Sequence, residues 1–168
     1  FTRRADGDPA YFEDCAAVCV NGAYQQERIL DVLREAMTNY SLDGIFFNIP
    51  GYPTTNYDGN YVGICQCENC KRRFYEWSGG MTLPTGEDDR DPAYRKYEEF
   101  KVYTVADMLH RVRSLVRPNV RACDGVSGLH AAQVVRKFAV GGTAELPGYA
   151  CAADVLVGGA QYVGNLSQ

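Results

Sequence analysis

The chain has 168 residues, 46% of them hydrophobic, and a formal net charge of -4. These values predict one globular domain over residues 1–168 and exclude the disordered and fibrous classes. Basic residues are spread among acidic ones and no apolar run is long enough to span a membrane, so neither nucleic acid nor a membrane surface is an expected partner.

The first predicted helix covers residues 23–40, where apolar residues recur at intervals of three and four. Its predicted apolar face comprises Ile29, Leu30, Val32, Leu33, Ala36, Met37 and Tyr40. A nearly continuous apolar run over 44–49 follows and predicts a buried parallel strand. Residues 51–63 are too polar and too broken for a core element, so we expect a long loop at the carboxyl end of that strand.

The next segment, residues 68–77, predicts a short helix, and a loop is expected over 81–92. Asp91 and Pro92 have the pattern of a helix cap and a first-turn proline, so a second long helix is predicted over 93–116. Three further elements are predicted beyond it: a strand over 119–123, a helix over 129–140 and a strand or turn-rich segment over 148–156.

The order of these elements predicts βα units around a parallel sheet, which makes the fold class α/β. Two architectures are consistent with this order. A complete (β/α)8 TIM barrel needs about 250 residues, so the chain would form part of one. A small doubly wound parallel sheet would be complete at this length. The length favours the doubly wound sheet, whereas the motifs described next favour part of a barrel.

Seven cysteines occur in the chain, and three of them, Cys65, Cys67 and Cys70, are crowded together. The odd count and this crowding argue against a disulfide framework and favour metal ligation or reduced thiols. Reduced thiols suggest a cytoplasmic protein. The first residue is Phe1, however, so we expect the true start of the protein to be missing together with any leader, and the compartment stays open.

The spacing of these three cysteines can bring three sulfur atoms onto one ion at the short distances of tetrahedral Zn–S bonds. A fourth ligand must come from another segment. Either Cys15 or Cys19 could reach the cluster, because loops that follow neighbouring barrel strands share one face. We therefore predict a structural zinc site in a loop over residues 50–75. Four sulfur ligands close the zinc shell to water, so such an ion would stabilise loops and would not catalyse.

Five segments follow one another in an order and spacing that are similar to a known enzyme family. They are AVCVNGAYQQE at 17–27, NY at 39–40, LDGIFFN at 42–48, GICQCENCKRRFYEWSGGMTLP at 63–84 and DPAYRKYEEFK at 91–101. This series resembles the catalytic TIM barrel of glycoside hydrolase family 42 β-galactosidases. It is closer still to related glycosyl hydrolases of the β-galactosidase or α-fucosidase type. The resemblance extends over about residues 5–116.

The resemblance implies a central segment of a glycosidase-like barrel, about three strands from the third onward, with Cys19 as the fourth zinc ligand. It also implies that the full-length protein hydrolyses glycosidic bonds of β-galactoside or α-fucoside type. The family carries its acid/base glutamate at the end of the strand matching 44–49, where this chain has Asn48, Ile49 and Pro50. An amide cannot exchange a proton as a carboxylic acid does. The alternative is therefore a catalytically inactive relative that binds carbohydrate or protein.

Five residues at the predicted carboxyl-end face are candidates for a carbohydrate site. Asn48 occupies the strand end, and Asp58 and Asp124 are the acids best placed near it. Tyr52 and Tyr57 lie in the long loop and offer flat rings suited to packing against a sugar. The reaction needs two carboxyl groups, and the resemblance places the nucleophile on a later strand outside this chain. The expected partner is a carbohydrate substrate, and a homo-oligomer of the full-length protein stays open.

Overall fold

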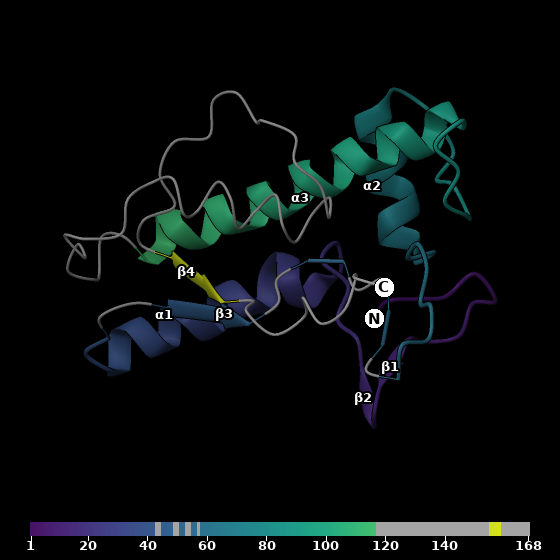
Figure 1. Ribbon diagram of the computed structural model, residues 1–168. Coiled ribbons are helices and arrows are strands. Elements are labelled where there is room, and N and C mark those ends of the chain that lie inside the picture. Colours follow the sequence, from purple (N-terminus) through teal and green to yellow (C-terminus); the bar gives the residue numbers. More distant parts are fainter. Residues whose placement is uncertain (43–44, 49–50, 53–54, 57, 117–154, 159–168) are drawn as a thin grey trace, which may run out of the picture.

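A computed structural model of the chain describes residues 1–42, 45–48, 51–52, 55–56, 58–116 and 155–158 (Figure 1). Its N-terminal part contains an antiparallel hairpin of β1 (Tyr11–Phe12) and β2 (Cys15–Ala16), which the sequence did not predict. The backbone N–H of Thr2 donates to Ala17 O at 2.8 Å, and that of Ala10 donates to Thr2 O at 3.0 Å. These bonds hold the N-terminal residues against the hairpin.

The first helix begins with a π-helical turn, η1 (Tyr24–Arg28), and continues as α1 (Ile29–Asn39). Together they confirm the helix predicted over 23–40. The strand predicted over 44–49 is present as β3 (Ile45–Asn48). The described residues that follow it, up to the next helix, form no helix or strand, in agreement with the predicted loop.

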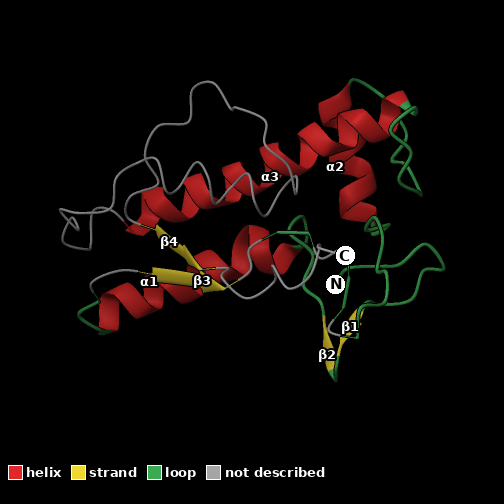
Figure 2. Ribbon diagram, viewed as in Figure 1, coloured by secondary structure: helices red, strands yellow, loops and turns green. Residues whose placement is uncertain are grey.

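Helices α2 (Glu68–Ser78) and α3 (Pro92–Val116) confirm the two helices predicted for these segments (Figure 2). The start of α3 follows the predicted capping pattern. The backbone N–H of Ala93 donates to Asp91 Oδ1 at 2.8 Å, so the Asp91 side chain caps the helix. Pro92 occupies the first helical position, where an N–H group would have no partner within the helix.

The buried side of α1 is narrower than the predicted apolar face. Leu33 is buried, and the partly buried residues that pack beside it are Ile29, Leu30 and Met37. Val32 is 45% exposed and Tyr40 is 68% exposed, so neither belongs to the buried side. Val32 lies about 100° around the helix from Leu33, and Tyr40 follows the last helical residue in an extended conformation.

Two buried clusters lie along α3, with α1 beside its C-terminal half and α2 beside its N-terminal half (Figure 1). The first, here called the aliphatic core, comprises Val20, Leu33, Val102, Val105, Ala106, Met108, Leu109, Val112 and Val116. The second, here called the aromatic core, comprises Cys19, Ile64, Cys65, Cys70, Phe74, Leu83, Tyr94, Tyr97 and Phe100. One helix therefore organises both regions of the described structure.

Strand β3 pairs in parallel with β4 (Val155–Gly158), with Ile45 opposite Val155 and Asn48 opposite Gly158. The pairing agrees with the parallel sheet expected from the order of elements. A parallel pair occurs in a TIM barrel and in a doubly wound sheet alike. Membership of a barrel therefore stays a prediction.

Three predicted segments fall wholly or mostly outside the described residues. They are the strand over 119–123, the helix over 129–140 and the segment over 148–156, of which the structure describes the last two residues as the start of β4. In the part of the chain that is described, no helix is long and apolar enough to cross a membrane.

Candidate metal centre

Four cysteine sulfur atoms converge between the N-terminal segment and the start of α2. The Sγ atoms of Cys19, Cys65, Cys67 and Cys70 all lie within 4.8 Å of one another, and these residues could hold a metal ion. Cys19 Sγ lies 3.3 Å from Cys70 Sγ, 3.6 Å from Cys67 Sγ and 3.7 Å from Cys65 Sγ. Cys15 is exposed in β2 and is not part of this group. The geometry therefore selects Cys19 as the fourth member.

Local structure places three of these sulfur atoms at one helix end. Cys67 immediately precedes α2, and Cys70 lies in its first turn. The N-terminus of a helix carries partial positive charge, which favours thiolates over thiols. Gly63 precedes the cluster with φ of +81°, a conformation that side chains rarely adopt, and a Cβ there would lie 3.1 Å from the ring of Tyr61. The turn into the cluster therefore depends on glycine.

The backbone of Arg3, in the N-terminal segment, is hydrogen-bonded to the same site. The N–H of Arg3 donates to Cys65 Sγ at 3.4 Å, and the N–H of Gln66 donates to Arg3 O at 2.8 Å. These two bonds tie Arg3 to the cysteine loop, one through the Cys65 sulfur and one through the backbone of Gln66. Because the chain runs from Arg3 through the hairpin to Cys19, these hydrogen bonds help to place Cys19, the fourth cysteine, beside the other three.

Asn21 connects the cysteine cluster to its surroundings. Its backbone N–H donates to Cys19 Sγ at 3.3 Å, and its side-chain Nδ2 donates to Cys70 Sγ at 3.3 Å and to Tyr52 Oη at 2.7 Å. Its Oδ1 accepts a hydrogen bond from Arg73 Nη1 at 3.0 Å. Sulfur is a weak acceptor when protonated and a stronger one when ionised, so these donors favour thiolates.

Hydrogen bonding within the cluster lowers the pKa of two of the four thiols and raises the pKa of the other two. Hydrogen bonds with the other sulfur atoms, first that of Cys19, lower the pKa of Cys67 far below its ordinary value. The hydrogen bond with Cys19 likewise lowers the pKa of Cys65 to about 7. Hydrogen bonds with Cys65 and then Cys67 raise the pKa of Cys19. Hydrogen bonds with the other three sulfurs, first that of Cys19, raise the pKa of Cys70, and burial raises both values further. Four thiolates this close repel one another, and a divalent cation would offset part of that repulsion.

Tyr52, predicted to contact a sugar, has its hydroxyl group committed to protein partners. It accepts from Asn21 Nδ2 and lies 2.6 Å from Thr104 Oγ1 on α3. Its ring meets the ring of Tyr97 edge-on, with centroids 6.1 Å apart. Burial raises the pKa of the Tyr52 hydroxyl well above its ordinary value, and the nearby Cys70 adds to the effect. Tyr52 therefore links the cysteine cluster to α3.

Of the four other predicted carbohydrate-site residues, the structure describes Asn48 and Asp58. Asn48 is the last residue of β3. Asp58 is exposed in a turn, where its Oδ2 accepts from Asn56 Nδ2 at 3.4 Å. Tyr57 and Asp124 lie outside the described residues.

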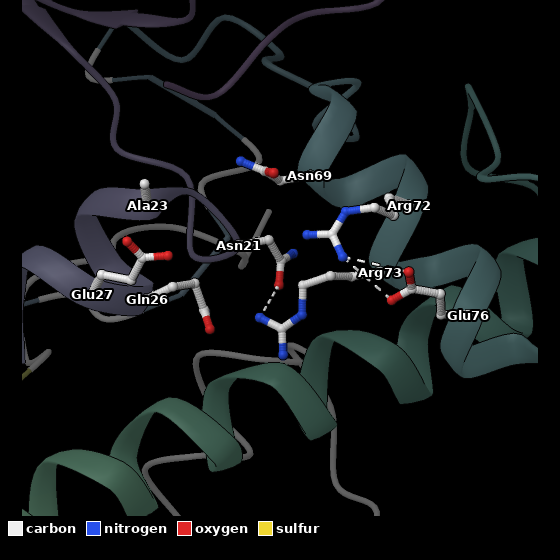
Figure 3. Close-up of a pocket in the computed structure, with 8 residues that line it drawn as sticks. All are labelled: Asn21, Ala23, Gln26, Glu27, Asn69, Arg72, Arg73 and Glu76. Carbon is white, nitrogen blue, oxygen red and sulfur yellow. Dashed lines mark hydrogen bonds and ion pairs between the residues drawn. The ribbon is translucent and has the colours of Figure 1, made fainter.

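A polar pocket of about 270 Å³ adjoins the cysteine cluster between η1 and α2 (Figure 3). It is lined by Asn21, Ala23, Gln26, Glu27, Asn69, Arg72, Arg73 and Glu76. The close-up shows the guanidinium group of Arg73 against the Asn21 side chain, while Arg72 pairs with Glu76 along α2. One of the lining residues, Asn21, is the residue that donates hydrogen bonds to two of the cysteine sulfurs.

A network of charged side chains extends from Asn21 through Arg73 to α3. Asp107 Oδ2 lies 3.5 Å from Arg73 Nη2 and 3.3 Å from Arg111 Nε. Arg111 in turn donates to the backbone and side-chain oxygens of Gln26 at 2.9 and 2.8 Å. Sequence reasoning singled out none of these residues. Only Asn21 has a signal in the local sequence. It stands two residues after Cys19, and a backbone N–H at that position can donate to the cysteine sulfur.

Comparison of the chain with protein-family models, with curated proteins and with solved structures gives no match.

Proposed function

We propose that Cys19, Cys65, Cys67 and Cys70 bind one structural zinc ion. Tetrahedral Zn–S bonds of about 2.3 Å place sulfur atoms about 3.8 Å apart. The distances from Cys19 Sγ, 3.3 to 3.7 Å, are close to that value, and all four atoms lie within 4.8 Å of one another. This convergence is the observation that carries the proposal. Four sulfur ligands leave no position for water, so the ion holds segments together and takes no part in chemistry.

Elemental analysis of the purified chain tests the zinc proposal directly. We expect one zinc ion per chain after dialysis against metal-free buffer, and X-ray absorption showing four sulfur neighbours at about 2.3 Å. A chain that folds and carries no stoichiometric metal, even after incubation with zinc, would overturn it.

We also propose that the full-length protein is a carbohydrate-active barrel that hydrolyses glycosidic bonds. The proposal is supported by the motif series that resembles glycoside hydrolase family 42 and by the location of the cysteine cluster. The chain leaves β3 at Asn48 and reaches Cys65 through the predicted loop, so the ion would fasten the segment that follows a strand end. In βα barrels the loops at that face carry the active site.

Turnover measurements on the full-length protein test this assignment. Chromogenic aryl β-galactosides and aryl α-fucosides are the probes, with a zinc-loaded preparation as the standard. We expect the full-length protein to hydrolyse one of these classes. We expect no hydrolysis by the 168-residue chain alone, because the mechanism needs two carboxyl groups and the resemblance places the nucleophile on a later strand outside this chain. Absence of turnover on every aryl glycoside tried would contradict the assignment.

A second candidate function, a non-catalytic carbohydrate- or protein-binding relative, is favoured by the amide at the end of β3. Asn48 stands at the last position of the strand, where a proton-donating acid would be needed. Replacing Asn48 by Asp or Glu in the full-length protein separates the two candidates. Hydrolysis by the unmodified protein favours the enzyme, and hydrolysis gained only by a variant shows an enzyme that has lost its acid. Binding of sugar without hydrolysis in all three forms favours the binding protein.

A further inference from the structure

The charge of the proposed metal centre has to be balanced inside the protein. Four thiolates around a divalent ion leave two surplus negative charges. Cys19 is 2% exposed, Cys65 is 3% exposed and Cys70 is fully buried, so water can offset little of this charge. Buried charge is tolerated where hydrogen-bond donors surround it. The donors to the sulfur atoms therefore decide how well the centre holds its ion.

Most of the donors that the structure shows are backbone groups. The backbone N–H groups of Arg3 and Asn21 donate to the sulfur atoms of Cys65 and Cys19, respectively. The bond to Cys70 Sγ comes instead from a side chain, Nδ2 of Asn21. Cys70 is the most deeply buried of the four, so its sulfur depends most on that donor.

The Asn21 amide is itself polarised by a cation. Arg73 Nη1 donates to Asn21 Oδ1 at 3.0 Å on the opposite side of the amide from the sulfur. A donor to the amide oxygen makes the amide N–H groups stronger donors, because hydrogen bonds in a chain polarise one another. Asn21 is 2% exposed and Arg73 is itself partly buried, so solvent weakens this effect little. Figure 3 shows the two side chains in this arrangement among the residues that line the polar pocket.

We infer that Asn21 is a positioning residue of the metal centre, and that it transmits the positive charge of Arg73 to the sulfur of Cys70. The inference rests on the proposed zinc site and adds a ligand-tuning role that the four cysteines alone do not provide. Groups that orient and hydrogen-bond metal ligands change metal affinity by about 10- to 100-fold when they are removed. Asn21 has the contacts that such a role needs: a sulfur on one side, a cation on the other and a Tyr52 hydroxyl that fixes its orientation.

Asn21→Asp is the most direct test, because it keeps the shape of the side chain and removes its N–H donors. Asn69→Asp is the matched control, since Asn69 lines the same pocket and the same chemical change is made one residue before Cys70. The wild type and both variants are compared as the whole chain, using competition with a chromophoric zinc chelator. We expect Asn21→Asp to weaken zinc binding by about 10- to 100-fold and Asn69→Asp to stay within about threefold of the wild type.

The Co²⁺-substituted forms give a readout that a purely structural role would not change. Losing a donor raises the energy of the sulfur electrons, so the sulfur-to-cobalt charge-transfer band of Asn21→Asp should move to longer wavelength. Arg73→Met should move the band in the same direction by a smaller amount, because the amide donor remains but is no longer polarised. Arg73→Met also decides the question if Asn21→Asp fails to fold.

The outcomes separate this inference from the zinc proposal. If the wild type binds no stoichiometric zinc, the metal centre itself is refuted. If the wild type binds zinc and both Asn21→Asp and Arg73→Met keep its affinity and its Co²⁺ band, the role of Asn21 is refuted and the zinc site stands. Weaker binding with an unshifted band in both variants would also overturn the inference, because it would show a general loss of stability.

Discussion

The aliphatic and aromatic cores share one helix but are held together in different ways. In the aliphatic core, the C-terminal half of α3 packs against α1 through residues such as Leu33, Val105 and Leu109, and apolar contact between helices accounts for the packing. In the aromatic core, the N-terminal half of α3 meets α2 and a loop that carries cysteines. Burial of apolar surface suffices for the first region, whereas the second also encloses four sulfur atoms that repel one another once they ionise.

Ring contacts supply the apolar part of the aromatic core. Phe74 meets Phe100 edge-on, with centroids 5.4 Å apart, and meets Tyr97 in the same way at 6.2 Å. Both phenylalanines are fully buried. These rings lie directly beside Cys70, one turn before Phe74 in α2. The aromatic core therefore combines close ring packing with a group of four cysteines that could hold a metal ion, whereas the aliphatic core has apolar contacts of side chains on two helices.

Removing the metal should have the largest effect and should separate the two regions. Structural zinc sites contribute on the order of 10 kcal/mol of binding free energy, which is folding free energy when the ligands are otherwise unordered. Treatment with a strong chelator should therefore abolish hydrogen-exchange protection over residues 62–78. Protection in α1 and in the C-terminal half of α3 should persist. Equal loss in both regions would show that the cores are one cooperative unit.

Truncation of the central ring should weaken the aromatic core next. Phe74→Ala removes a fully buried ring and its two edge-on contacts, and we expect a loss of about 3–5 kcal/mol in the free energy of unfolding. Chemical denaturation of the zinc-loaded chain measures this loss. The variant should also release zinc faster than the wild type, because the Phe74 ring no longer packs in the cluster that contains Cys70.

A matched truncation in the aliphatic core should leave the metal unaffected. Leu109 is 2% exposed and lies in the half of α3 that faces α1. Leu109→Ala should lower the free energy of unfolding by about 2–5 kcal/mol, with zinc affinity unchanged in the chelator competition. A parallel fall in zinc affinity would contradict the separation of the two regions.

The Tyr52 hydroxyl connects the two regions, and a single-atom substitution removes it. Tyr52→Phe keeps the ring and deletes the group that bonds Asn21 Nδ2 and Thr104 Oγ1. We expect a loss of about 1–3 kcal/mol, because a buried donor is left without its partner. Thermal unfolding of the wild type and Tyr52→Phe measures it, with Tyr61→Phe as a control on an exposed ring.

The smallest effect is expected for the cysteine outside the cluster. Cys15 is exposed in β2, so Cys15→Ser should change the free energy of unfolding by no more than about 0.5 kcal/mol. Zinc stoichiometry should stay at that of the wild type, whereas Cys19→Ser should lose the ion. Loss of zinc in Cys15→Ser would reverse the assignment of the fourth ligand.

Local patterns in the sequence predicted the main helices, the strand β3 and the start of α3. The capping of α3 by Asp91 and Pro92 depends on neighbours in the chain. Such features are fixed within a few residues, and sequence patterns report them well. Val32 and Tyr40 show the limit of this reasoning, because the width of a buried stripe depends on the neighbour that covers it.

By itself, the sequence determined that three cysteines would gather at one turn, because their spacing limits how far apart their sulfur atoms can lie. Only the tertiary structure decided that Cys19 and not Cys15 joins them, since that choice depends on how the N-terminal segment folds back through Arg3 and β2. The contacts of Asn21 with Tyr52, Cys70 and Arg73 were likewise decided by tertiary structure. They join residues 31 to 52 positions apart, and no local pattern records which distant side chains a folded chain will bring together.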